Sequence, residues 1–149
     1  MTAQEMWDSY TKENPKDAQE KYEAWYFGDN KATANDLANL VISGEKTATA
    51  SAFDLYEVYG DALPQQDSFS VVLDFEGNAK CMIKIAKVYT TPFCKVTDEH
   101  AFKEGEGDKS LAYWRKVHQD FFANEMKEHQ LIFDERMLVV CEEFEVVFK

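Results

Sequence analysis

The stretch SGEKTATAS, residues 43–51, places a lysine among small hydroxyl side chains and contains no large apolar residue. A lysine that is withdrawn from water has its pKa lowered from about 10.4 toward neutrality, and it can then act as a general base. A hydroxyl beside such a base can become a nucleophile. Lys46, with Thr47 and Thr49, is therefore the first candidate for chemistry, although most lysines simply face solvent.

Lys46 would need an acidic partner that orients its ammonium and receives charge. The segment KEGEGDKS offers Glu104, Glu106 and Asp108, and its simpler interpretation is a solvated loop. His100 and Glu104 are four residues apart, which is the spacing of one helix face. Two such side chains without further ligands do not make a metal site, so we expect neither a metal nor a cofactor.

A second group of side chains could bind a planar or charged ligand. Trp25 and Phe27 stand in a non-helical segment and could stack on a base, or could equally belong to the core. Asp29 could bind an amine or hydroxyl of a ligand, or cap the following helix. Arg115 could bind a phosphate, with a surface ion pair as the ordinary alternative. Together with Thr47, these are the expected substrate-binding residues.

The composition limits the classes of partner. The 149 residues are 45% hydrophobic, which suits a packed core, and they carry 28 acidic against 16 basic side chains for a net charge of −12. Such a chain repels polyanions on average, so a small ligand or a local patch suits it better than a long duplex. No apolar run could cross a bilayer, no signal peptide is recognisable, and three scattered cysteines show no CxxC pair. We therefore expect a cytoplasmic protein without a membrane partner.

The elements that must position these residues follow from periodicity and from the glycines and prolines. Helices or helical turns are expected at residues 2–14, 33–46, 55–67, 96–108 and 110–130, and strands at 46–53, 68–75, 79–91 and 137–148. Thr33 is the expected N-cap of the second helix and Gly44 its C-terminal glycine. Trp114 and His118 are interpreted as core residues of the last helix. The expected buried faces are Leu37, Leu40 and Val41 in the second helix, and Leu111, Trp114, Val117, Phe121 and Met126 in the last.

This pattern predicts one α+β domain over residues 1–149, with a helical extension at about residues 1–24 and a small mixed β-barrel surrounded by helices. One physical difficulty concerns Lys46 and Thr49. Residues three apart in a regular strand point to opposite faces of the sheet. The two side chains can meet only if the chain bends or bulges between Gly44 and Thr47.

Three blocks in order, WYFGD, GEKTATAS and EGEGDKSLAYWRKVHQDFF, resemble the ASCH-domain family from about Trp25 to the C-terminus. The resemblance implies a PUA-like β-barrel with a cleft associated with RNA or nucleoside chemistry. Known relatives include a small amidohydrolase that deacetylates N4-acetylcytidine and a member reported to act as a ribonuclease. The amidohydrolase uses a Lys, a Thr three residues later and a Glu, which Lys46, Thr49 and Glu104 match. The glycine-rich insertion makes Glu106 a competing assignment.

Three hypotheses follow from these observations. The first is a hydrolase for a small nucleoside or nucleotide, such as an N-acylated cytidine, in which Lys46 deprotonates Thr49 or a water and Glu104 or Glu106 holds the lysine. The second is an RNA-binding module without catalysis. The third is a ribonuclease that uses the same cleft, with Lys46 stabilising the anionic transition state.

Overall fold

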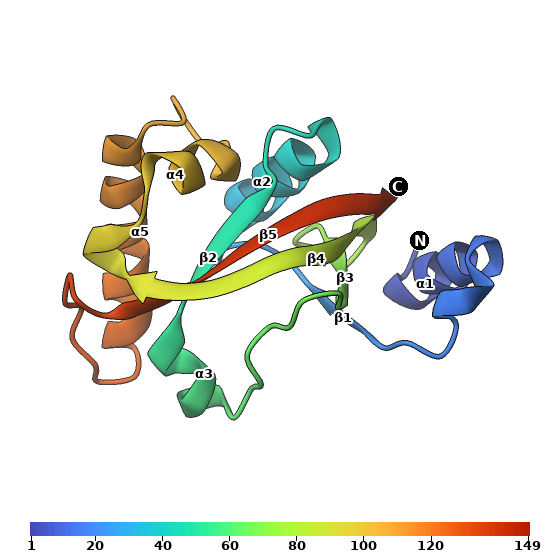
Figure 1. Ribbon diagram of the computed structural model, residues 1–149, viewed down its shortest axis with the longest axis horizontal. Helices are drawn as coiled ribbons and strands as arrows, with labels where there is room; N and C mark the ends of the chain where they lie inside the picture. Colours follow the sequence, from blue (N-terminus) through green and yellow to red (C-terminus); the bar gives the residue numbers. More distant parts are fainter.

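Five strands form one sheet in the order β1-β3-β4-β5-β2, and five α-helices lie around it (Figure 1). The computed structural model describes residues 1–149. The strands are β1 (Tyr22–Trp25), β2 (Ala48–Ala52), β3 (Phe69–Leu73), β4 (Ala79–Pro92) and β5 (Leu138–Phe148). The helices are α1 (Ala3–Glu13), α2 (Lys31–Ser43), α3 (Phe53–Tyr59), α4 (Asp98–Glu104) and α5 (Leu111–Lys127), and short 3-10 turns cover Pro15–Asp17 and Phe93–Lys95.

The sheet is mixed and open. β1 pairs with β3 in parallel, whereas the other three pairings are antiparallel, and the long strands β4 and β5 form its centre. The predicted α+β class is present, but the expected barrel is not closed, because β1 and β2 are edge strands that do not pair with each other. β1 is only four residues long and is held by β3 alone. The sequence also gave no expectation of this strand.

Side-chain caps define where the helices begin. In α2 the side chain of Asn30 accepts a hydrogen bond from the Thr33 backbone, so Asn30 is the N-cap and the assignment of Thr33 was wrong by three residues. The predicted end at Gly44 is confirmed, with φ 85° in the left-handed region that glycine tolerates. Thr97 caps α4 and Ser110 caps α5 in the same way. Both helices lie at one end of the sheet (Figure 1).

The helices bury faces that differ in part from the expected ones. α2 buries Ala34, Ala38 and Val41, because the small alanines let the helix lie close to the sheet. α5 buries Trp114, His118, Phe122 and Met126, so Phe122 and not Phe121 continues the stripe at four-residue spacing. α1 packs Met6, Trp7 and Tyr10 against Phe69, Val71 and Met82, which fixes the N-terminal extension onto β3 and β4.

Two of the three cysteines are buried in the sheet. Cys81 and Cys141 are free and buried, and burial raises the pKa of their thiols to about 11 and about 12, which favours the neutral thiol. No helix combines the length and the apolar character that a bilayer span requires.

Candidate active site

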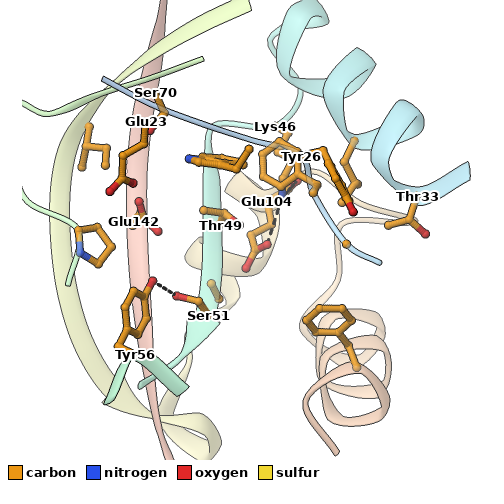
Figure 2. A pocket seen from close by; sticks show the side chains of 18 of the residues that line it. Glu23, Tyr26, Thr33, Lys46, Thr49, Ser51, Tyr56, Ser70, Glu104 and Glu142 are labelled. Atoms are coloured by element: carbon orange, nitrogen blue, oxygen red, sulfur yellow. Dashed lines mark hydrogen bonds and ion pairs between the residues drawn. The ribbon is translucent and has the colours of Figure 1, made fainter. Parts of the chain in front are cut away.

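Lys46 lies in a connection between α2 and β2, and this resolves the difficulty of its spacing from Thr49. The chain turns at Gly44, the Lys46 backbone N–H donates to the Leu40 carbonyl at 3.0 Å, and β2 begins only at Ala48. Strand alternation therefore does not apply to Lys46. Its side chain and that of Thr49 line the same cavity (Figure 2).

The end of α4 is fitted tightly against this connection. Gly105 has φ 72°, and a Cβ added there would lie 2.1 Å from the carbonyl oxygen of Glu45. The Thr47 backbone N–H also donates to the Lys103 carbonyl at 2.7 Å. The glycine-rich segment thus allows the end of the helix to touch the backbone beside Lys46, and it brings acidic side chains to the lysine.

The ammonium of Lys46 contacts both candidate acids. Its Nζ lies 3.1 Å from Glu104 Oε1 and 3.0 Å from Glu106 Oε2, with a longer contact of 3.5 Å to the Glu104 carbonyl. The Lys46 and Glu104 side chains are each 1% exposed, and Glu106 is 16% exposed. The two assignments left open by the sequence are therefore not exclusive in geometry. No hydrogen bond joins Lys46 to Thr49, whose hydroxyl makes none within the chain.

Glu104 is the centre of a buried polar cluster. His100 Nε2 lies 2.7 Å from Glu104 Oε2, and the Trp114 indole N–H donates to the same oxygen. His118 Nε2 is 3.5 Å from Glu104 Oε1, and the His118 ring stacks on Trp114 at 4.2 Å. Trp114 and His118 are buried, as expected, but both also hold this carboxylate, which the sequence did not indicate.

These contacts shift the pKa values of the groups in the cluster. Burial opposes the charge on Lys46, but the charges and hydrogen bonds of Glu104 and Glu106 prevail and raise the pKa of its ammonium. Burial likewise opposes the charge on Glu104, but Lys46, His118 and His100 bring its pKa well below 4.5. His118 also has a raised pKa, because Glu104 outweighs its burial. The direction of the Lys46 pKa shift is opposite to the one expected from burial alone, because two anions accompany the buried lysine.

The cavity beside Lys46 is large and acidic. Its volume of about 790 Å³ lies within the range typical of sites for small molecules. Two lysines, Lys21 and Lys46, line it together with six carboxylates. These are Glu23, Asp29, Glu104, Glu106, Glu125 and Glu142. Side chains from both edge strands, β1 and β2, contribute to the wall, so the opening of the sheet coincides with the cavity.

The predicted substrate-binding residues divide into two groups. Trp25, Phe27 and Asp29 line the cavity, although Phe27 is only 6% exposed and packs its ring 5.3 Å from Lys46 Nζ. Thr47 and Arg115 do not line it. Thr47 faces Lys103, and Arg115 follows buried Trp114 on α5, so it points to solvent and donates to the Cys94 carbonyl at 3.2 Å. The structure thus gives no support to a substrate contact by either residue.

Two polar features of the cavity were not identified in the sequence. Glu142, on β5, is 8% exposed and faces the cavity (Figure 2). Ser51 Oγ and the Tyr56 hydroxyl form a hydrogen bond of 2.6 Å beside it. The sequence pattern could have identified Glu142. It stands between the apolar residues Val140 and Phe144 at two-residue spacing, so all three side chains share one face of the strand.

Glu104, Glu106 and His118 offer ligand atoms that all lie within 4.8 Å of one another, which is the spacing of a metal site. The ammonium of Lys46 already lies between the two carboxylates. A divalent ion bound there would have to displace that charge or suffer its repulsion. The donor set therefore fits the lysine better than a metal.

The family model described as an ASCH domain matches residues 23–148. This chain belongs to the ASCH-domain family. The match includes β1 from Glu23 onward and all the cavity residues named above except Lys21, and it leaves α1 outside. Among curated proteins, none matches the chain.

Solved structures share the overall fold of this chain. The ASCH domain of Lactobacillus crispatus JV V101 is 35% identical, with a TM-score of 0.91 over 98% of this chain and 94% of that one. A protein from Enterococcus faecalis V583 is 34% identical, with a TM-score of 0.89 over 97% and 87%. A hypothetical protein at 18% identity and a TM-score of 0.56, over 85% and 98%, shares the fold alone.

Proposed function

We propose that this ASCH domain is a hydrolase of small nucleoside-type amides, with an N-acylated cytidine as the representative substrate, and that the cavity beside Lys46 is its active site. One observation carries the proposal. A fully buried ammonium is held by two carboxylates in the wall of a cavity that is large enough for a nucleoside. In this proposal the curved sheet acts as an open PUA-like barrel, with the substrate at its mouth.

Glu106 is the side chain best placed to accept a proton. The oxygens of Glu104 are occupied by Lys46, His100, Trp114 and His118. Glu106 uses only Oε2 for Lys46, and its Oε1 makes no hydrogen bond within the chain. Glu106 therefore takes the role of general base, whereas Glu104 fixes the position of the lysine.

The reaction follows from these roles. Glu106 accepts a proton from a water, and the resulting hydroxide adds to the carbonyl carbon of the amide. The negative charge that develops on the carbonyl oxygen is stabilised by the Lys46 ammonium, which lines the cavity. The C–N bond then breaks, and Glu106 returns its proton to the leaving nitrogen. Lys46 remains charged throughout, and the Thr49 hydroxyl is free to orient the water or the carbonyl.

RNA binding without catalysis and phosphodiester cleavage are the alternative proposals. Both bring phosphates against a lining of six acidic side chains and two lysines, in which carboxylates still outnumber lysines when Glu142 is protonated. Coulomb repulsion disfavours that approach. The same argument favours an unphosphorylated nucleoside over a nucleotide as the substrate.

The experiment compares N4-acetylcytidine, its 5′-monophosphate and a short single-stranded RNA, with acetate release and RNA cleavage as the readouts. We expect acetate from the nucleoside, and turnover of the monophosphate at least about tenfold slower at low salt, with a smaller difference at high salt because of screening. Absence of acetate from every substrate would contradict the hydrolase proposal. RNA cleavage that is lost in Lys46→Ala would establish the ribonuclease instead.

A further inference from the structure

Glu142 is a largely buried acidic residue whose carboxyl group has no partner within the chain. The residue is 8% exposed and lines the cavity, and its oxygens, which make no hydrogen bond or ion pair, are open to the cavity and not sealed inside the protein. A carboxyl group in this position can take its hydrogen-bond partners from a ligand. In Figure 2 its carboxyl and that of Glu23 point toward one another into the cavity. The proposed reaction uses neither group.

The surroundings of Glu142 favour its protonated form. Burial is the main cause, with the charges of Glu23 on β1 and Glu104 on α4, and together they raise the pKa of Glu142 from 4.5 to about 7. From α3, Tyr56 faces it as a neutral phenol, since burial raises the pKa of Tyr56 to about 12. The paired positions on the neighbouring strands are Thr49 and Val88, which carry no charge. No cation therefore neutralises Glu142.

We propose that Glu142, assisted by Glu23, is the specificity group of the cavity and binds an amidine-type edge of a nitrogen heterocycle, N=C–NH, through two hydrogen bonds, one donated by its carboxyl O–H and one accepted by its carbonyl oxygen. The carboxyl O–H donates to the ring nitrogen, and the carbonyl oxygen accepts from the exocyclic N–H. The inference rests on the proposed function, because it takes this cavity as the substrate site.

The chemistry of the edge follows from the charges. A ligand that brings a basic nitrogen can take part of the proton, so the pair gains the strength of a charge-assisted hydrogen bond. The second carboxylate, Glu23, favours the positive charge that this places on the ligand. A lactam edge, such as that of uridine, places a weakly basic carbonyl oxygen at the same position. It takes less of the carboxyl proton, so its hydrogen bond to Glu142 is weaker.

The position of Glu142 agrees with the reaction geometry. Glu142 and Thr49 are directly paired on β5 and β2, and opposite residues in an antiparallel pair have Cβ atoms about 4.5–5.5 Å apart. A heterocycle held at Glu142 therefore lies beside Thr49. Trp25 and Tyr26 line the same cavity and can contact the flat face of the ring.

The test is isothermal titration calorimetry with cytidine and uridine, which differ in this edge alone, so that no turnover is required. We expect wild-type protein to bind cytidine at least about tenfold more tightly than uridine. Glu142→Gln presents the same donor and acceptor at every pH and should retain binding, whereas Glu142→Met should lose about tenfold to a hundredfold. Glu145→Gln, on the same strand but outside the cavity lining, is the control for loss of one charge.

The pH dependence separates recognition by Glu142 from a structural role. Above about pH 7 the affinity of the wild type should fall about tenfold per pH unit, since Glu142 must carry the proton, and the affinity of Glu142→Gln should stay constant. Glu23→Gln should move the fall to lower pH. Parallel profiles for wild type and Glu142→Gln, unchanged binding in Glu142→Met, equal affinity for the two nucleosides, or no binding of either would overturn the inference. Cytidine binding without acetate release from N4-acetylcytidine would overturn the hydrolase proposal alone.

Discussion

Replacing Lys46 by methionine tests the buried ion cluster through stability. The substitution keeps the length of the side chain and removes its charge, so it leaves Glu104, which is 1% exposed, without its main counter-ion. Removal of one partner of a buried pair costs about 3–5 kcal/mol of unfolding free energy. For a chain of this size the melting temperature should fall by roughly 6–20 °C.

The assay is urea denaturation of wild type, Lys46→Met and Lys31→Met. Lys31 makes the same kind of ion pair with Glu76, but both side chains are more than 60% exposed, so its loss should cost less than about 1 kcal/mol. In the wild type the pKa of Glu104 is lowered on folding. The stability that this shift provides is fully present above pH 4.5, and it is lost as the pH falls through the pKa of Glu104 in the folded protein. Without Lys46, burial raises the pKa of Glu104, so acidification should narrow the difference between variant and wild type.

A double variant completes this test. Lys46→Met with Glu104→Gln removes both charges, so it should be more stable than Lys46→Met alone at neutral pH. A Lys46→Met protein within about 1 kcal/mol of wild type at neutral pH would refute the reasoning, because it would mean that Glu104 does not depend on the lysine.

Two further predictions concern the backbone and the cavity. Gly105→Ala should lower the unfolding free energy by at least about 2 kcal/mol more than Gly77→Ala in urea denaturation. Both glycines have positive φ, but only a Cβ at Gly105 would collide with the Glu45 carbonyl. Equal losses of stability in the two variants would contradict the close approach of Gly105 to Glu45. The raised pKa of Glu142 gives a stability contribution that is present below pH 4.5 and is lost as the pH rises through about 7. Between about pH 4 and pH 8 the unfolding free energy of the wild type should therefore fall by about 3 kcal/mol relative to that of Glu142→Gln. Parallel plots of unfolding free energy against pH for the two proteins would exclude a raised pKa of Glu142.

Local patterns were sufficient for most of the elements. The end of α2 at Gly44, the strands β3, β4 and β5, and the helix after Ser110 follow from periodicity and from residues that stop or start helices. β1 was missed because it is four residues long and is held in the sheet only by its pairing with β3. The order of the strands and the absence of closure depend on contacts between distant segments, which one sequence does not encode locally.

The sequence was sufficient to identify several residues of the site but not to infer which of them carry a charge. Lys46, Thr49, Glu104 and Glu106 were identified, and the structure brings all four to one cavity. The protonation of Lys46 could not be inferred, because it depends on how many acids meet the ammonium. Glu142 was overlooked because no spacing rule connects β5 to the loop before β2.

The central claim is that Glu106, beside a permanently charged Lys46, activates water for amide hydrolysis. The most direct measurement is the rate of cytidine formation from N4-acetylcytidine by wild type, Glu106→Gln and the exposed control Glu76→Gln. The account predicts measurable turnover by the wild type and the control, and a loss of at least about a hundredfold in Glu106→Gln. No turnover by the wild type, or equal rates for wild type and Glu106→Gln, would contradict it.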